Sequence, residues 1–219
     1  MSRSWVDGSI LYARERYPFR VFVPIAVGLA LAGLTDEWFR SIQGSHGSLE
    51  FLVSVVVTVT MMFQFRLWDD LADQPYDRIH HPTRVLSKTS TLAPFALNVA
   101  LAGMVSVILL VLAEANYLGF VLLNMAAAVW YIAIPIDWRR SITGRHVLLL
   151  KYPVFVFLLV PVENRKATLI LSMAAVYLCS AIYELFHDGD IRSRPAAQAL
   201  MFTEVCLLGF VFLYSQREI

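Results

Sequence analysis

The chain has 219 residues, of which 58% are hydrophobic and 16% are charged, and its formal net charge is +1. About a quarter of the residues of a soluble domain are charged, so this composition excludes an ordinary soluble protein and indicates a polytopic membrane protein. No basic stripe with interleaved aromatic residues is present, which argues against nucleic-acid binding. We expect one all-α transmembrane domain over residues 1–219, with the lipid bilayer as its surroundings.

The predicted elements begin with residues 1–18, where charged and apolar positions alternate. This pattern predicts a cytoplasmic segment at the membrane interface. A membrane-spanning helix needs about 20 mostly apolar residues, and the fifth apolar run is short and interrupted by Lys151 and Pro153. We predict a bundle of about seven transmembrane helices, at residues 19–38, 49–68, 90–113, 116–136, 146–162, 167–187 and 196–216.

The distribution of Lys and Arg predicts the topology, because cytoplasmic loops carry an excess of both. Thirteen of these residues fall on the side of the N-terminus and four on the opposite side, with Lys151 inside a run. We therefore expect the N-terminus inside and the C-terminus outside. The connection after the second helix then lies on the cytoplasmic side.

Four carboxylates lie within nine residues at the end of the second run: Asp69, Asp70, Asp73 and Asp77. In a helix, Asp70, Asp73 and Asp77 fall on one face, although Pro75 is expected to end the regular helix. Like charges on one face repel one another unless a cation lies between them, and hard oxygen ligands suit Mg²⁺. The alternative is an acidic loop neutralised by basic neighbours at positions 66, 78 and 84.

A second acidic group ends the sixth run. Glu184 and Asp188 are one helical turn apart, and Asp190 follows after a glycine. Both acidic groups fall on the same predicted side of the membrane. Two such groups at one end of a bundle are able to hold metal ions on opposite sides of a diphosphate.

The segment Asp69-Asp-Leu-Ala-Asp-Gln-Pro-Tyr-Asp77 resembles the NDxxDxxxD motif of the UbiA superfamily of intramembrane prenyltransferases, with Asp69 in the Asn position. His81-Pro-Thr-Arg-Val-Leu86 is similar to the KPxRPL continuation of that family, and Glu184-Leu-Phe-His-Asp188 resembles its second DxxxD motif. The stretch from Tyr131 to Arg140 resembles the tyrosine and basic residues after its fourth helix. Family members usually have nine helices, whereas seven are predicted here.

This resemblance implies a UbiA-like fold and Mg²⁺-dependent ionisation of a prenyl diphosphate. The prenyl group is then transferred to an aromatic or polar acceptor within the membrane. The alternative is a UbiA-type terpene cyclase, in which an internal alkene captures the cation and no acceptor is needed. The residues implied as catalytic are Asp70, Asp73, Asp77, Glu184 and Asp188. The residues implied as metal ligands are these five together with Asp69 and Asp190. Alternatively, Asp69 orients a neighbouring residue and does not bind metal.

Basic residues must complete a diphosphate site, because phosphate oxygens need charge-assisted donors. The candidates for diphosphate binding are Arg66, Arg84, Arg139, Arg140 and Lys151, with Tyr131 beside them. An ammonium group is expensive in an apolar stretch, so Lys151 alternatively reaches the interface or pairs with Glu204. Arg139 and Arg140 are alternatively topological anchors.

Glu204 is the other charge within an apolar run. It is a candidate general base that removes a proton after carbon–carbon bond formation. Its alternatives are a neutral acid and one half of a structural ion pair. A function of another class, a membrane scaffold or transporter, predicts that the aspartates of the first motif are dispensable.

Overall fold

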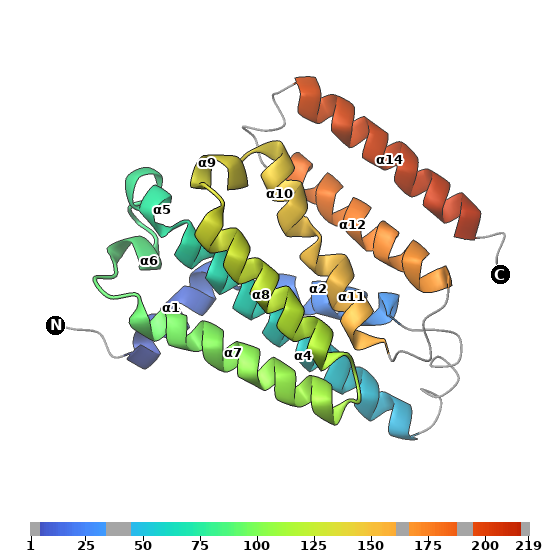
Figure 1. Cartoon of the computed structure of the whole chain (residues 1–219), viewed down its shortest axis with the longest axis horizontal. Coiled ribbons are helices and arrows are strands. Elements are labelled where there is room, and N and C mark those ends of the chain that lie inside the picture. The colour runs from blue at the N-terminus through green and yellow to red at the C-terminus, as the bar shows by residue number, and fades with distance from the viewer. Residues whose placement is uncertain (1–4, 34–44, 161–166, 188–194, 216–219) are drawn as a thin grey trace.

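The computed structural model describes residues 5–33, 45–160, 167–187 and 195–215, and every regular element within them is a helix. The long helices run back and forth beside one another, and the short connecting helices gather at one end of the bundle (Figure 1). The elements are α1 (Trp5–Arg16), α2 (Phe19–Ala32), α4 (Ser45–Ala72), α5 (Gln74–His80), α6 (Val85–Lys88), α7 (Ala93–Leu112), α8 (Tyr117–Ala133), α9 (Ile136–Arg139), α10 (Ile142–Leu149), α11 (Lys151–Leu159), α12 (Ala167–His187) and α14 (Pro195–Ser215).

Five of the described helical segments are long and apolar enough to cross a membrane, as in a multi-pass membrane protein. They are Ser48–Ala72, Ala93–Leu112, Ile142–Leu159, Thr168–Phe186 and Pro195–Tyr214. The two remaining apolar runs form the shorter helices α2 and α8. Each of the seven predicted runs contains helix, but only five helical segments are long and apolar enough to cross a membrane, so a bundle of seven spans is not confirmed.

The fifth predicted run is divided in two. Helix α10 ends at Leu149 and α11 begins at Lys151. Pro153 lacks a backbone N–H and so leaves the carbonyl of Leu149, four residues earlier, without its helical partner. The break places Lys151 at a helix start, and its ammonium group turns to an acidic side chain of α4.

The main core lies where α2, α4, α8, α11 and α12 meet, and Phe65, Phe120 and Phe155 are fully or almost fully buried there. The rings of Phe65 and Phe155 are 5.5 Å apart between centroids. In a membrane these rings exchange contacts with lipid for contacts with one another, so they stabilise the bundle mainly through close packing. The core holds α4 against α11, and these two helices carry the ion pair of Asp69 and Lys151.

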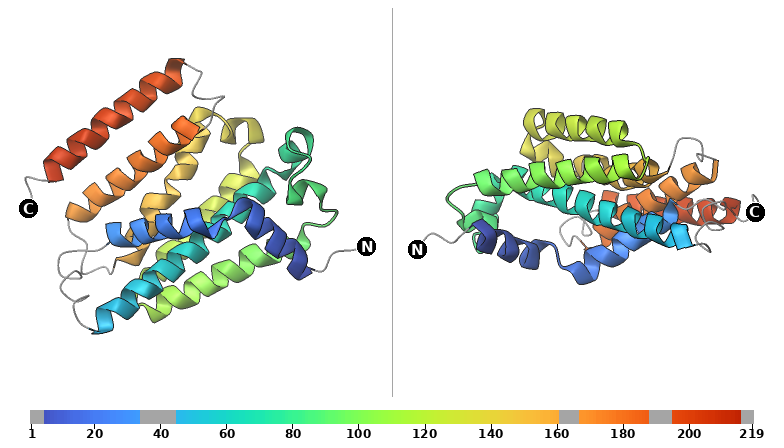
Figure 2. Two further views of the ribbon diagram at one scale, coloured as in Figure 1. Left: turned by 180° about the vertical axis from the view of Figure 1, so that it is seen from behind. Right: turned by 90° about the horizontal axis from the view of Figure 1, so that it is seen from below.

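Helix α1 does not simply lie along the membrane interface, because its side chains enter the bundle. Tyr12 is buried in a second cluster with Leu67, Leu86, Phe95 and Val99, from α4, α6 and α7. Figure 2 shows α1 and α2 lying across the back of the bundle. The prediction of a segment at the interface therefore describes only the exposed side of α1, which carries Trp5 and Ile10.

Helix α14 forms the edge of the bundle, with α12 as its principal neighbour (Figure 1). Most of its large apolar side chains, among them Phe202, Phe210 and Phe212, are exposed. In a membrane such side chains face lipid. The charged residues of the candidate site lie on the other helices.

Candidate functional site

The first acidic motif lies at the end of α4, where the helix stops at Ala72 and α5 starts at Gln74. Pro75 stands in the first turn of α5, where its missing N–H does no harm. The backbone N–H of Asp73 donates to the carbonyl of Asp69 and that of Asp77 donates to the carbonyl of Asp73, both at 3.0 Å. Asp69, Asp73 and Asp77 therefore follow one another at successive turns.

This arrangement differs from the predicted face of Asp70, Asp73 and Asp77. Burial raises the pKa of Asp73, and the negative charges of Asp69 and Asp77 raise it further, against the opposing effect of Arg139 and Arg140. The carboxylates that repel one another are thus Asp69, Asp73 and Asp77.

Asp70 instead binds helix α1. Its carboxylate accepts a hydrogen bond from the Tyr12 hydroxyl at 2.8 Å and a bidentate pair from Arg16 at 2.7 and 3.0 Å. Arg66, one turn earlier on α4, lies 3.5 Å away. Asp70 is 6% exposed, so these partners occupy most of its hydrogen-bonding capacity. Burial and the neighbouring negative charge of Asp70 raise the pKa of Tyr12, which keeps that hydroxyl a donor.

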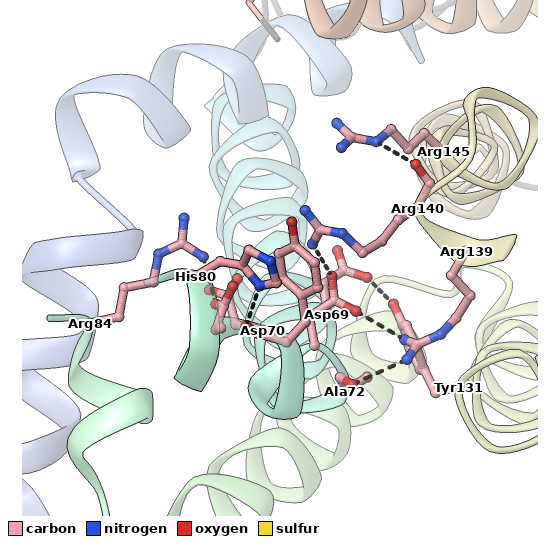
Figure 3. Close-up of polar contacts among 12 residues, drawn as sticks. Asp69, Asp70, Ala72, His80, Arg84, Tyr131, Arg139, Arg140 and Arg145 are labelled. Carbon is pink, nitrogen blue, oxygen red and sulfur yellow. Dashed lines mark hydrogen bonds and ion pairs between the residues drawn. The ribbon is translucent and has the colours of Figure 1, made fainter. Parts of the chain in front are cut away.

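Asp69 binds two residues from the opposite side of the site. Lys151 of α11 forms an ion pair with it. The Tyr131 hydroxyl of α8 donates a hydrogen bond to it (Figure 3). The considered pairing of Lys151 with Glu204 is therefore wrong, because the ammonium group points to α4. The lysine side chain is only 11% exposed, and the carboxylate side chain is 19% exposed.

Asp73 forms ion pairs with Arg139 and Arg140 of the α9 region. Arg139 is 3.3 Å and Arg140 is 3.2 Å from its carboxylate oxygens. Arg139 also donates to the carbonyl of Ala72 at 3.1 Å, and the guanidinium of Arg140 lies 3.6 Å from the centroid of the Tyr76 ring. Both arginines thus contact the end of α4 and the start of α5, which a role as topological anchors alone does not require.

Gly144 makes this position of α9 possible. A Cβ atom at Gly144 would lie 2.2 Å from the backbone oxygen of Trp138 and 2.6 Å from that of Arg139. The turn between α9 and α10 also has Ser141 as its N-cap, whose hydroxyl accepts from the Gly144 N–H at 3.1 Å. Close backbone packing in this turn therefore aims Arg139 and Arg140 at Asp73.

The two remaining described carboxylates of the acidic motifs, Asp77 and Glu184, also have basic partners. Arg84 lies 2.5 Å from Asp77, which is 3% exposed and whose second oxygen has no described partner. Arg145 of α10 lies 3.1 Å from Glu184 of α12. The other two predicted ligands of the second acidic group, Asp188 and Asp190, lie outside the described residues.

These groups surround one polar cavity of about 920 Å³. Seven basic side chains and five carboxylates line it. The basic residues are Arg16, Arg66, Arg84, Arg139, Arg140, Arg145 and Lys151, and the carboxylates are Asp69, Asp70, Asp73, Asp77 and Glu184. With neutral histidines the lining carries a surplus of two positive charges, which favours an anionic ligand.

An apolar groove of about 810 Å³ adjoins this cavity between α4, α7 and α8. Small residues such as Ala96, Ala100 and Gly103 leave the space along α7. Tyr131 lies between the two spaces. It lines the groove, and its hydroxyl donates a hydrogen bond to Asp69, which lines the cavity. Trp68 lies beside it, with the two ring centroids 5.3 Å apart.

The described residues do not form a ready site for Mg²⁺, although their oxygen donors suit this ion in kind. Each carboxylate of the cavity is engaged by a basic side chain. Within the described ranges, no three His, Cys, Asp or Glu side chains lie together as a metal would require. Their present arrangement is that of an ion-paired pocket.

The structure brings together most of the residues predicted from the sequence. The described carboxylates of the two acidic motifs and all five basic candidates line the polar cavity, and Tyr131 binds Asp69 of this lining. Glu204 does not line it. Glu204 of α14 is 4% exposed and lies 3.4 Å from His146 of α10. Arg16, Arg145 and Tyr12 were missed, because no local motif marks a basic or aromatic residue that reaches the site from another helix.

No known family model matches the chain, and neither a curated protein nor a solved structure matches it. The resemblance to the UbiA superfamily therefore rests on sequence motifs alone: the two acidic motifs, the residues that follow the first, and the stretch from Tyr131 to Arg140.

Proposed function

We propose that the protein binds a prenyl diphosphate and, with Mg²⁺, ionises it and transfers the prenyl group to an acceptor in the membrane. The observation that carries this proposal is the closeness of a positively charged cavity and an apolar groove, since Tyr131 of the groove binds Asp69 of the cavity. A prenyl diphosphate has the same two parts, a polyanionic head and a hydrocarbon chain. The resemblance of residues 69–86 and of Glu184 to UbiA motifs supports the same proposal.

The basic residues of the cavity would bind the diphosphate and stabilise it as it departs. The bond between the first prenyl carbon and the bridging oxygen breaks, and its electron pair goes to the diphosphate. Arginine donors fixed before the reaction stabilise this developing charge without reorganising. Arg139 and Arg140 are held by Asp73 and by the turn at Gly144, so they need little rearrangement.

The allylic cation would form at the junction of cavity and groove. The ring faces of Trp68 and Tyr131 lie there, and aromatic faces attract cations. Apolar walls exclude the water that would otherwise capture the cation. A carbon atom of the acceptor then bonds to the cation and loses a proton.

Mg²⁺ belongs to this proposal as a charge-neutralising partner of the departing diphosphate. It usually binds through one or two carboxylates and the phosphate oxygens of the substrate. Among the described carboxylates of the cavity, the candidates for binding Mg²⁺ in this way are Asp69, Asp73, Asp77 and Glu184. The excess of Lys and Arg on one side of the predicted topology favours a cytoplasmic position for the cavity.

The test is to supply the purified full chain and Mg²⁺ with geranyl, farnesyl or geranylgeranyl diphosphate, first without any acceptor. Release of diphosphate only after an aromatic acceptor is added supports transfer. Hydrocarbon or terpene alcohol formed without an acceptor supports the alternative of a terpene cyclase. Turnover that EDTA leaves unchanged, or no turnover of any prenyl diphosphate under either condition, contradicts the proposal.

A matched pair of variants links the activity to the cavity. Asp73→Asn keeps the shape of the side chain but removes the charge that holds Arg139 and Arg140, and we expect a loss of about a hundredfold in turnover. Asp137→Asn is the control, because Asp137 is exposed on α9 and does not line the cavity. Equal activity of the two variants would separate the reaction from this site.

A further inference from the structure

We infer that a diphosphate enters the cavity before any divalent cation, held by basic side chains alone, and that the bound diphosphate then completes the metal site. This inference rests on the proposed function and adds the order of binding. It starts from a property of the described pocket, in which the carboxylates expected to hold metal are already neutralised by ion pairs.

The ion pairs make the carboxylates poor first ligands for a cation. Asp70 is held by three hydrogen bonds from Tyr12 and Arg16, and Asp69 is held by Lys151 and Tyr131. A metal ion that displaced such a partner would leave a buried basic group uncompensated, which is strongly unfavourable. An approaching cation also meets the surplus of positive charge in the lining.

The same pocket is prepared for an anion. The Nε–H group of Arg139 is buried without a hydrogen-bond partner within the described part of the chain, and that of Arg66 has only the Asp70 carboxylate, 3.5 Å away. Arg139 is nearly fully buried, with 7% of its side chain exposed. A buried charged donor without an acceptor is costly, and phosphate oxygens are strong acceptors for guanidinium groups. A diphosphate thus satisfies a donor that the protein leaves open.

Binding of the diphosphate changes the position of the carboxylates. Basic side chains that also bind phosphate oxygens interact less strongly with Asp73, Asp77 and Glu184, while the anion adds negative charge to the pocket. Mg²⁺ is commonly held by one or two carboxylates together with substrate phosphates. The metal site therefore forms from the protein and the diphosphate together.

The experiment is calorimetric titration of the detergent-solubilised full chain with three probes. Inorganic diphosphate is added in EDTA, Mg²⁺ is added alone, and Mg²⁺ is added to the diphosphate-loaded protein. We expect binding in the first and third titrations and none in the second over the same concentration range. Binding of the diphosphate in EDTA should weaken as salt is raised, because exposed charges are screened.

Two arginines on the same helix supply a matched control. Arg16 lines the cavity, whereas Arg14 is exposed on α1 and does not. Arg16→Ala should weaken diphosphate binding in EDTA by about tenfold or more, the loss of a charge-assisted hydrogen bond. Arg16→Lys should recover part of the loss, and Arg14→Ala should bind as the unaltered chain does. Inorganic monophosphate should bind less tightly than diphosphate, because it engages fewer of the arginines.

The outcomes separate the two proposals. Diphosphate that binds only when Mg²⁺ is present overturns the inferred order but leaves the proposed function standing. Tight binding of Mg²⁺ alone that Asp73→Asn abolishes also overturns the order, since it shows a site formed without the anion. Diphosphate that binds under neither condition contradicts both proposals. Binding in EDTA that Arg16→Ala leaves unchanged places the anion elsewhere and overturns the inference.

Discussion

The pair of Lys151 and Asp69 gives the sharpest prediction about stability. Lys151→Met keeps a side chain of similar length but removes the ammonium group that lies on the Asp69 carboxylate. Asp69 then remains buried with only the Tyr131 hydroxyl as a described donor. Without Lys151, the Asp69 carboxylate has lost most of the favourable interaction that offsets the free-energy cost of removing it from water.

The magnitude follows from the burial of the two side chains. Removing one partner of a fully buried pair destabilises a protein by about 3–5 kcal/mol. Because the side chains are 11% and 19% exposed, the lower part of this range applies, about 3 kcal/mol. For a chain of this length that corresponds to a fall in Tm of roughly 6–12 °C.

The assay is thermal unfolding in detergent, compared with a double variant. Asp69→Asn combined with Lys151→Met leaves no unpaired charge, and the Asn oxygen is still able to accept from Tyr131. We expect the double variant to be more stable than Lys151→Met alone, the signature of coupled residues. Lys88→Met is the control, because Lys88 is exposed at the end of α6.

Two results would refute this reasoning. One is a Tm of Lys151→Met that equals the Tm of the control variant Lys88→Met, with both close to the Tm of the unaltered chain. The other is a double variant whose loss equals the sum of the two single losses, which would mean that the residues act independently.

Three further predictions concern other parts of the bundle. Gly144→Ala should destabilise the chain by about 1–3 kcal/mol, because its Cβ overlaps backbone oxygens; Gly28→Ala, with open space around it, should unfold at an unchanged or slightly higher temperature. Ala100→Phe should raise the KM for farnesyl diphosphate by about tenfold or more and leave binding of inorganic diphosphate unchanged, because Ala100 lines only the groove. Glu204→Gln should keep its turnover in the prenyl diphosphate assay, since Glu204 lies beside His146 and away from the cavity; a large loss would restore it as the base.

Local sequence features predicted the helices well. Apolar runs must be helical in a membrane because every backbone group needs an internal partner, and the run of residues 167–187 agrees with α12 at both ends. Pro75 correctly marked a break near the end of α4. Lys151 stood out on physical grounds, since a charge in an apolar run needs a partner, and the structure supplies one.

The contacts between helices could not be predicted in the same way. Helical spacing grouped Asp70 with Asp73, but the partners of Asp70 are Tyr12 and Arg16, which are 58 and 54 residues away in the chain. The side to which a carboxylate turns is decided by which helix packs beside it. That choice depends on the shape of the whole bundle, and no spacing within one helix records it.

The attachment of α1 has a consequence for which substitutions will have similar effects in this protein. Besides the bonds to Asp70, the carboxylate of Glu15 accepts from the backbone N–H of Val85 at 2.9 Å, and Ser9 accepts from Asn98 at 2.8 Å. Helix α1 is thus bound to α4, α6 and α7, and its bonds to α4 are made to Asp70 of the acidic motif. In a mutational scan, substitutions at Tyr12 or Arg16 should therefore group with those at the aspartates, and an amino-terminal tag will need a spacer that leaves α1 in place.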